Sequence, residues 1–120
     1  MNNKQTGKYG ENIAVEFLKK QGFEILETNY RYSKMAEIDI IASKKDIIHF
    51  IEVKTRMNNS FGNPLEAVTK TKLDSINRCS KFYLSKINKK YKKQQIDAIG
   101  IILDNQGKTE INFIENINLN

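Results

Sequence analysis

Apolar residues recur at helical spacing in two stretches of the chain. Near the N-terminal end, the apolar stripe consists of Ile13, Ala14, Phe17 and Leu18. Thr6 suits an N-cap and Gly22 a stop, so a first helix is predicted from Thr6 to about residue 21. The second stripe consists of Leu65, Val68, Leu73, Ile76, Cys79 and Tyr83. It follows Pro64, which suits a first helical position, and predicts one continuous helix over residues 65–87.

Five other stretches have the composition of strands: residues 23–31, 37–42, 47–56, 95–103 and 109–114. The third of them, IIHFIEVKTR, begins as a nearly continuous apolar run, which is typical of a central strand covered on both faces. Turns are predicted at residues 33–34, 44–46 and 105–107, and a loop at 57–63. The order helix, three strands, helix, two strands predicts an α/β fold with a mixed sheet flanked by helices. With 120 residues, we expect a single domain with its core at about residues 7–115.

The charge balance favours a polyanionic partner. The chain has 20 Lys and Arg against 14 Asp and Glu, a net charge of +6. Such an excess raises the local concentration of phosphate groups and releases counterions on binding. The lone Cys79 cannot form an internal disulfide, and no signal peptide or apolar run of about 20 residues is present. We therefore expect a cytoplasmic protein that does not associate with membranes.

Three residues on neighbouring strands have the chemistry of a metal site. Glu52 and Lys54 share one face of the strand at 47–56, and Asp39 lies in the isoleucine-rich strand before it. If the hairpin places Asp39 beside Glu52, the two carboxylates repel by about 4 kcal/mol at about 4 Å and an effective dielectric of about 20. A divalent cation reverses that repulsion, and Mg²⁺ typically binds one or two carboxylates, water and phosphate oxygens. Lys54 would then lie beside the metal and position an attacking water, as phosphodiester hydrolysis requires.

The segments GKYGENIAVEFLKKQGFEILETNYR, AEIDIIA, FIEVKTR and FGNPLEAVTKTK, in this order, resemble the YraN family of small bacterial proteins over about residues 7–100. That family in turn resembles the PD-(D/E)XK nuclease superfamily, especially the archaeal Holliday-junction resolvases. The resemblance implies a restriction-endonuclease-like core in which Asp39, Glu52 and the backbone carbonyl of Val53 bind Mg²⁺ or Mn²⁺. It also implies that Glu11 on the first helix completes the metal site and that Lys72 on the second helix faces it.

The expected function is that of a metal-dependent endonuclease, and nucleic acid, DNA in particular, is the expected partner. Contacts with nucleic acid are predicted at Arg56 and Lys72 and in a late basic loop formed by Lys89, Lys90, Lys92 and Lys93. So small a chain has little surface for reading a sequence, which favours structure-selective or dimeric action. Branched DNA and a homodimer are both suggested by the resolvase resemblance.

Each of these residues also has a structural interpretation. Asp39 could bond turn amides, and Glu52 with Lys54 could be a surface ion pair of little energetic value. Glu11 could favour the positive end of its helix dipole, and Lys72 could be solvated, as could the late lysines. Two other functions stay open on the same fold: a nucleic-acid-binding module without catalysis, and a protein-interaction adaptor in which the acidic cluster is a relic.

Three further residues are interpreted as structural. His49 lies on the opposite face of its strand from Glu52 and is expected to be a buried, hydrogen-bonded core residue rather than a general base. Cys79 lies on the apolar stripe of the second helix and is expected to be inert. Relatives usually carry an arginine two residues before Asp97, where this chain has Gln95, which weakens any charged partner for Asp97.

Overall fold

Five strands form one mixed sheet in the computed structural model, which describes residues 2–34, 36–58 and 62–117. In chain order the elements are α1 (Asn3–Lys20), β1 (Glu24–Ser33), β2 (Ala36–Lys44), β3 (Ile47–Arg56), the 3₁₀ turn η2 (Pro64–Ala67), α2 (Lys70–Lys86), β4 (Lys93–Leu103) and β5 (Thr109–Ile114). The strands lie in the order β1-β2-β3-β4-β5, and every neighbouring pair is antiparallel except β3 and β4. α2 is the crossover between those two parallel strands. The predicted α/β class, a restriction-endonuclease-like mixed sheet flanked by helices, is confirmed.

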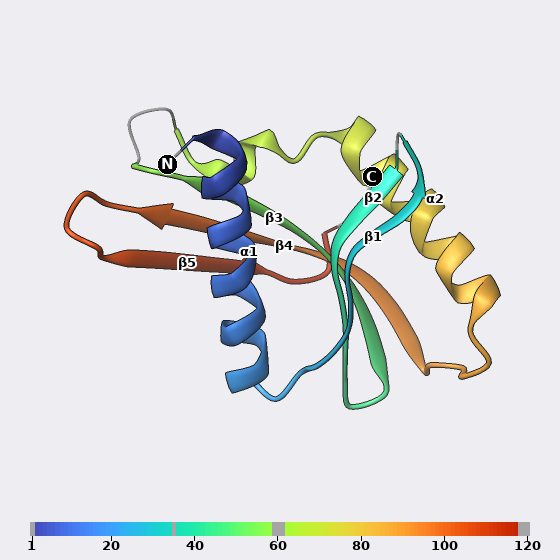
Figure 1. Cartoon of the computed structure of the whole chain (residues 1–120). Coiled ribbons are helices and arrows are strands. Elements are labelled where there is room, and N and C mark those ends of the chain that lie inside the picture. The colour runs from blue at the N-terminus through green and yellow to red at the C-terminus, as the bar shows by residue number, and fades with distance from the viewer. Residues whose placement is uncertain (1, 35, 59–61, 118–120) are drawn as a thin grey trace.

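The two helices cover opposite faces of the sheet (Figure 1). Ile51 and Val53 of β3 pack with Leu18 of α1, whereas Ile48 and Phe50 pack on the side of α2. The alternation of faces along a strand explains this division, and covering on both sides explains the apolar start of β3. Glu52 lies two residues after Phe50 on β3, so its side chain is on the same face of the sheet, the face that α2 covers.

The first helix begins earlier than the sequence suggests. Asn2, and not Thr6, is the N-cap: its side chain accepts from the Gln5 amide, and the Gln5 side chain accepts from the Asn2 amide. This reciprocal capping box satisfies the first amides of the helix. The Thr6 hydroxyl donates within the first turn, to the Asn2 carbonyl at 3.0 Å. Glu11 consequently lies in the middle of α1, beyond the reach of the helix-end dipole.

The second helix is interrupted, so the prediction of one helix over residues 65–87 was wrong. The chain forms η2, then passes through Val68 in an extended conformation, and α2 begins only at Lys70. Thr69 is the reason, because its side chain accepts from the Lys72 amide at 3.2 Å and so caps a new helix. The interruption places Lys72 in the first turn of α2.

The strand positions were predicted more closely than the helix ends. β3 and β5 have the predicted bounds, while β1, β2 and β4 extend one to two residues beyond theirs at one or both ends. Lys45 and Asp46 form the β2–β3 turn with φ of 51° and 64°, as a tight two-residue hairpin requires. Of the predicted loop at 57–63, residues 59–61 lie outside the described residues. None of the described helices has the length and apolar character needed to cross a membrane.

Candidate active site

A cavity of about 600 Å³ lies where the C-terminal end of β3 meets the first half of α1 and the start of α2. The first half of α1, the C-terminal end of β3 and the start of α2 all lie toward the upper side of Figure 1. The charged side chains that line the cavity are Glu11, Asp39, Glu52, Lys54, Arg56 and Lys72, and Val53 lines it too. The structure thus brings together every residue that the sequence assigned to the metal site or to contacts beside it.

β2 and β3 cease to pair at the edge of this cavity. Their paired positions run from Lys44 with Ile47 to Ile40 with Ile51. Beyond that point the Val53 amide donates to Oδ2 of Asp39, at 2.8 Å. A side chain therefore replaces the backbone carbonyl that would otherwise accept this bond, and the Asp39 carboxyl is fixed against β3 one residue from Glu52.

The Asp39 carboxyl is buried beside the Glu52 carboxyl, which disfavours the charged form of Asp39. Burial, followed by the hydrogen bond and the charge of Glu52, raises the pKa of Asp39 from 3.8 to about 8. The Val53 amide and the Lys72 ammonium favour the charged form and so limit this rise. Near neutral pH the Asp39 carboxyl therefore either holds its proton or takes a cation beside it.

Glu52 is the most deeply buried acid of the cavity, with 2% of its surface exposed. Its Oε2 lies 3.3 Å from Nζ of Lys72. That contact has the distance of an ion pair but not the angles of a hydrogen bond, and Oε2 has no hydrogen-bond donor among the described residues. A buried carboxylate oxygen without a donor is costly, so this atom is open to a further positive ligand.

The position of Glu11 depends on close packing between α1 and β3. A side chain at Gly10 would overlap the hydroxyl of Thr55, so only glycine allows this approach. Asn29, in the left-handed region at φ 50°, donates from Nδ2 to Glu11 at 2.9 Å and to Glu37 at 3.3 Å. Burial raises the pKa of Glu11, and the Asn29 hydrogen bond opposes that rise. Asn29 is a site residue that sequence reasoning missed, since a polar residue in a strand gave no signal.

Lys54 and Arg56 follow Glu52 along the same side of β3 and contribute positive charge to the cavity. Within the described part of the chain, neither side chain forms an ion pair. Nε of Arg56 is buried and has no hydrogen-bond partner there. Both cations are thus available to an anionic ligand.

The late lysines lie far from this cavity. β3 and β4 run parallel, with Lys93 paired to Ile47 and Ile102 paired to Arg56. Lys89, Lys90, Lys92 and Lys93 therefore lie at the start of β3, the opposite end of that strand from the cavity. Their contact with nucleic acid stays a prediction, but it does not occur next to the carboxylates.

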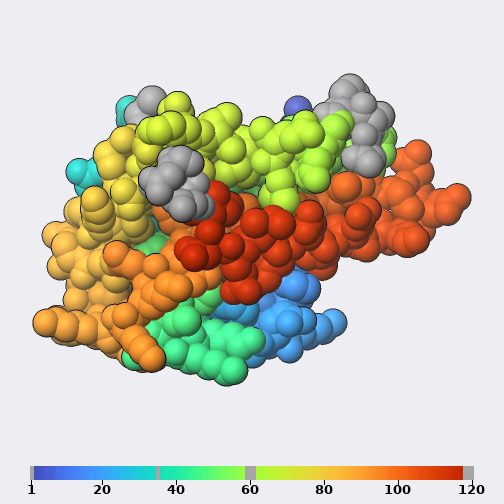
Figure 2. Space-filling model, turned by 180° about the vertical axis from the view of Figure 1, so that it is seen from behind, coloured from blue at the N-terminus to red at the C-terminus, as the bar shows by residue number. Residues whose placement is uncertain are grey.

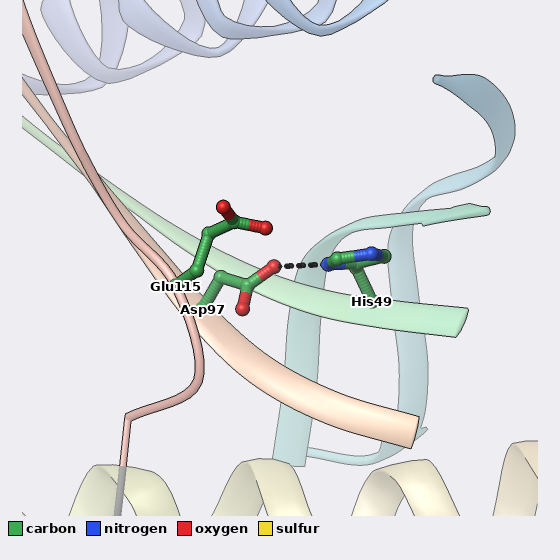
Figure 3. A group of neighbouring side chains, drawn as sticks. All are labelled: His49, Asp97 and Glu115. Carbon is green, nitrogen blue, oxygen red and sulfur yellow. Dashed lines mark hydrogen bonds and ion pairs between the residues drawn. The ribbon is translucent and has the colours of Figure 1, made fainter. Parts of the chain in front are cut away.

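A second buried acid lies on β4, and Figure 3 shows it with its neighbours. Oδ2 of Asp97 is 2.5 Å from Nδ1 of His49, and Oδ1 accepts from the Gln95 side chain and the Asn116 amide, each at 2.8 Å. The structural interpretation of His49 is confirmed, and the partner of Asp97 is this histidine. Glu115 offers a ligand atom within 4.8 Å of the other two. Both oxygens of Asp97 already have hydrogen-bond partners. These bonds connect β4 to β3 through His49 and to the segment after β5 through the Asn116 amide, so we interpret Asp97 as a structural residue.

The fold and cavity together define a class: a small α/β protein with a restriction-endonuclease-like topology and a carboxylate–lysine cluster at the end of a central strand. Residues 10–101 match the profile of the uncharacterised protein family UPF0102. The chain belongs to this family, which confirms the YraN-type resemblance. A UPF0102 protein of Dictyoglomus thermophilum is 49% identical over 108 residues, covering 90% of this chain and 91% of that one. UPF0102 proteins of Clostridium perfringens and Acetivibrio thermocellus are 45% and 40% identical and cover 93% and 92% of their own lengths.

Proposed function

We propose that this protein is a divalent-metal-dependent endonuclease that hydrolyses phosphodiester bonds in nucleic acid, with DNA as the expected substrate. The observation that carries the proposal is the pairing of Asp39 with Glu52 in a cavity that also receives Lys54 and Lys72. The sequence resemblance implies that Asp39, Glu52 and Lys54 correspond to the metal-site residues of the PD-(D/E)XK superfamily. Branched DNA is the substrate structure that the resolvase resemblance suggests.

The residues fit a divalent cation. Burial and the neighbouring Glu52 raise the pKa of Asp39, so a cation beside Asp39 would favour its charged form. A buried oxygen of Glu52 lacks a hydrogen-bond donor among the described residues. Carboxylate and carbonyl oxygens are the ligands that Mg²⁺ and Mn²⁺ take. Asp39, Glu52 and the Val53 carbonyl would hold the ion, with Glu11 as a further acidic ligand. When bound, the ion would polarise the phosphate and lower the pKa of a coordinated water.

The remaining charged residues suit the handling of a phosphate. Lys54 lies two residues beyond Glu52 on the same side of β3, where its ammonium can orient a water and offset charge on the phosphate. Arg56 has a buried Nε that finds no hydrogen-bond partner in the described part of the chain, and its guanidinium is a planar donor group for phosphate oxygens. Lys72 is paired with Glu52 and is a third cation that a phosphate can recruit.

A cleavage assay tests the proposal. Labelled single-stranded, linear duplex, splayed and four-way-junction DNA would be incubated with the protein in Mg²⁺, Mn²⁺ or EDTA, beside labelled RNA. Metal-dependent cleavage is expected, and Asp39→Asn and Glu52→Gln should each lower it by about a thousandfold, the scale of losing one electrostatic contact to a transition state. Asp74→Asn, a change of a solvent-accessible acid outside the cavity, is the matched control and should cleave normally.

Absence of cleavage in every metal would contradict the nuclease proposal. One alternative is a nucleic-acid-binding module on the same fold that has no catalytic activity. The Lys72–Glu52 ion pair favours this alternative, because the ion pair already neutralises part of the acidic charge without a metal. Salt-sensitive binding without turnover would support it. Loss of both activities would leave the protein-interaction adaptor. Light scattering with and without DNA would test the homodimer.

A further inference from the structure

Lysines gather at the end of the sheet opposite the cavity. They come from the last turn of α1, the β2–β3 turn and the end of α2 with the segment that follows: Lys19, Lys20, Lys44, Lys45, Lys86, Lys89, Lys90, Lys92 and Lys93. We call these nine residues the basic end. In Figure 2 the β2–β3 turn and the start of β4 lie side by side along the lower edge of the molecule.

Hydrogen bonds to backbone carbonyls hold the three segments of the basic end together. Nζ of Lys44 donates to the Gln21 carbonyl at 2.6 Å, which joins the β2–β3 hairpin to the end of α1. The Lys92 amide donates to the Asp46 carbonyl at 3.0 Å, which joins the hairpin to the segment before β4. Tyr91 packs against the core on the α2 side. The lysines are therefore carried on anchored segments and form one fixed surface.

This surface has little compensating negative charge. Asp46 is the single acid within the three segments, and Glu24 and Glu115 lie on adjoining ones. Within the described residues, Lys19 is the one member of the basic end that forms an ion pair, with Glu16 at 3.8 Å. So many ammonium groups without an acidic partner among the described residues produce a positive potential that attracts a polyanion.

We propose that the basic end is a second binding surface for the phosphate backbone of nucleic acid, separate from the cavity. The choice of nucleic acid over another polyanion rests on the proposed function. The five steps along β3 from Ile47 to Glu52 correspond to about 17 Å at about 3.3 Å per residue. Duplex DNA rises about 3.4 Å per base pair, so a backbone that reaches both places must extend at least about five base pairs beyond the phosphate in the cavity. Lysines act as point charges on phosphates, so this surface binds without regard to sequence.

The test measures binding without catalysis. Affinity for a 20-base-pair duplex would be measured in EDTA over a range of salt concentrations, for the full chain and for a variant with Lys89, Lys90, Lys92 and Lys93 all changed to Gln. A matched control changes four other exposed cations to Gln: Lys34, Arg78, Lys81 and Lys108. Both variants have a net charge of +2, which is the +6 of the chain less four.

The basic-end variant should bind the duplex about tenfold more weakly near 0.1 M salt. The slope of log affinity against log salt should also become shallower by about two to four, because each lost phosphate contact changes it by about 0.9. The control should change affinity less than about twofold, because its charges are dispersed and screened beyond about 10 Å. Equal affinities for the two variants would overturn the proposal. So would a basic-end variant that loses binding to phosphatidylglycerol vesicles but keeps duplex binding, since the surface would then serve membranes. This experiment measures binding and not cleavage, so its result does not depend on whether the protein is a nuclease.

Discussion

Asp97 and Glu52 are buried acids on adjacent central strands, exposed by 0% and 2%, yet their surroundings differ. Asp97 has partners for both oxygens, from His49, Gln95 and the Asn116 amide. Glu52 faces a second carboxyl, that of Asp39, and within the described residues its Oε2 has an ion pair but no hydrogen bond. Both oxygens of Asp97 have hydrogen-bond partners, whereas one oxygen of Glu52 has no hydrogen-bond donor among the residues that the structure describes.

This difference separates a structural acid from a candidate functional one. A carboxylate that accepts several hydrogen bonds contributes to stability, and removing it leaves its donors buried without partners. A pair of carboxyls held close together lowers the stability of the metal-free protein and is retained where a ligand compensates. Opposite effects of mutation on stability are therefore expected at the two positions.

The largest effect is expected at Asp97. Asp97→Ala should lower the free energy of unfolding by about 3–5 kcal/mol, because His49 and the Asn116 amide lose their buried acceptor. Urea unfolding would measure this loss, and Asp97→Asn, which keeps one acceptor oxygen, should lose less and remains measurable if the alanine variant does not fold. A loss below about 1 kcal/mol in both variants would show that the hydrogen-bonded group contributes little.

Removing the Asp39 carboxyl should have the opposite effect and raise the free energy of unfolding. Its pKa in the folded protein, about 8, lies above its ordinary 3.8, so the folded state binds the extra proton between these pH values. The contribution of this carboxyl to stability is therefore complete below about pH 4 and is lost as the pH rises toward 8. In EDTA at pH 8, Asp39→Asn should be more stable than the natural chain by about 1–3 kcal/mol, and the difference should shrink at pH 5. Urea unfolding at the two pH values would measure it, and a difference independent of pH would contradict this account.

The smallest effect is expected at Lys72, whose ammonium partly neutralises the carboxyl pair. Lys72→Met should strengthen Mn²⁺ binding by about threefold to tenfold, since about 1 kcal/mol of competing positive charge is removed. Calorimetric titration with Mn²⁺ would measure the affinity directly. Lys70→Met is the matched control, because Lys70 lies in the same helical turn and pairs with the accessible Asp74 instead. Unchanged or weaker Mn²⁺ binding by Lys72→Met would mean that Lys72 does not compete for the site.

The sheet could be predicted because its signal is local. A continuous apolar run marked β3, and alternation placed Glu52 and Lys54 on one face, as the structure has them. The helix starts were wrong because competing caps lie close together in the sequence: Asn2 displaces Thr6, and Thr69 interrupts a periodic pattern that continues through it. Periodicity does not identify which polar side chain captures the first amides.

The residues predicted for the site line one cavity, but their interactions with one another were not predicted. The resemblance supplied Glu11 and Lys72, two residues whose positions in the sequence carry no signal of proximity to Asp39. The ion pair of Lys72, the bond from Val53 to Asp39 and the part played by Asn29 depend on geometry that spacing does not encode. The separation of the late lysines from the cavity follows from the parallel pairing of β3 and β4, which sequence order alone leaves undetermined.

The glycine at position 10 has a consequence for the geometry of the cavity. The close approach of α1 to β3 requires a residue without a side chain there, and Glu11 is the next residue along the helix. Any larger residue at position 10 would push the helix outward while every acid and lysine of the cavity remained in the sequence. If the cavity binds the proposed metal ion, such a variant would retain the complete set of charged residues and still lose the geometry that holds the ion, so position 10 bears on the site as directly as the acids do.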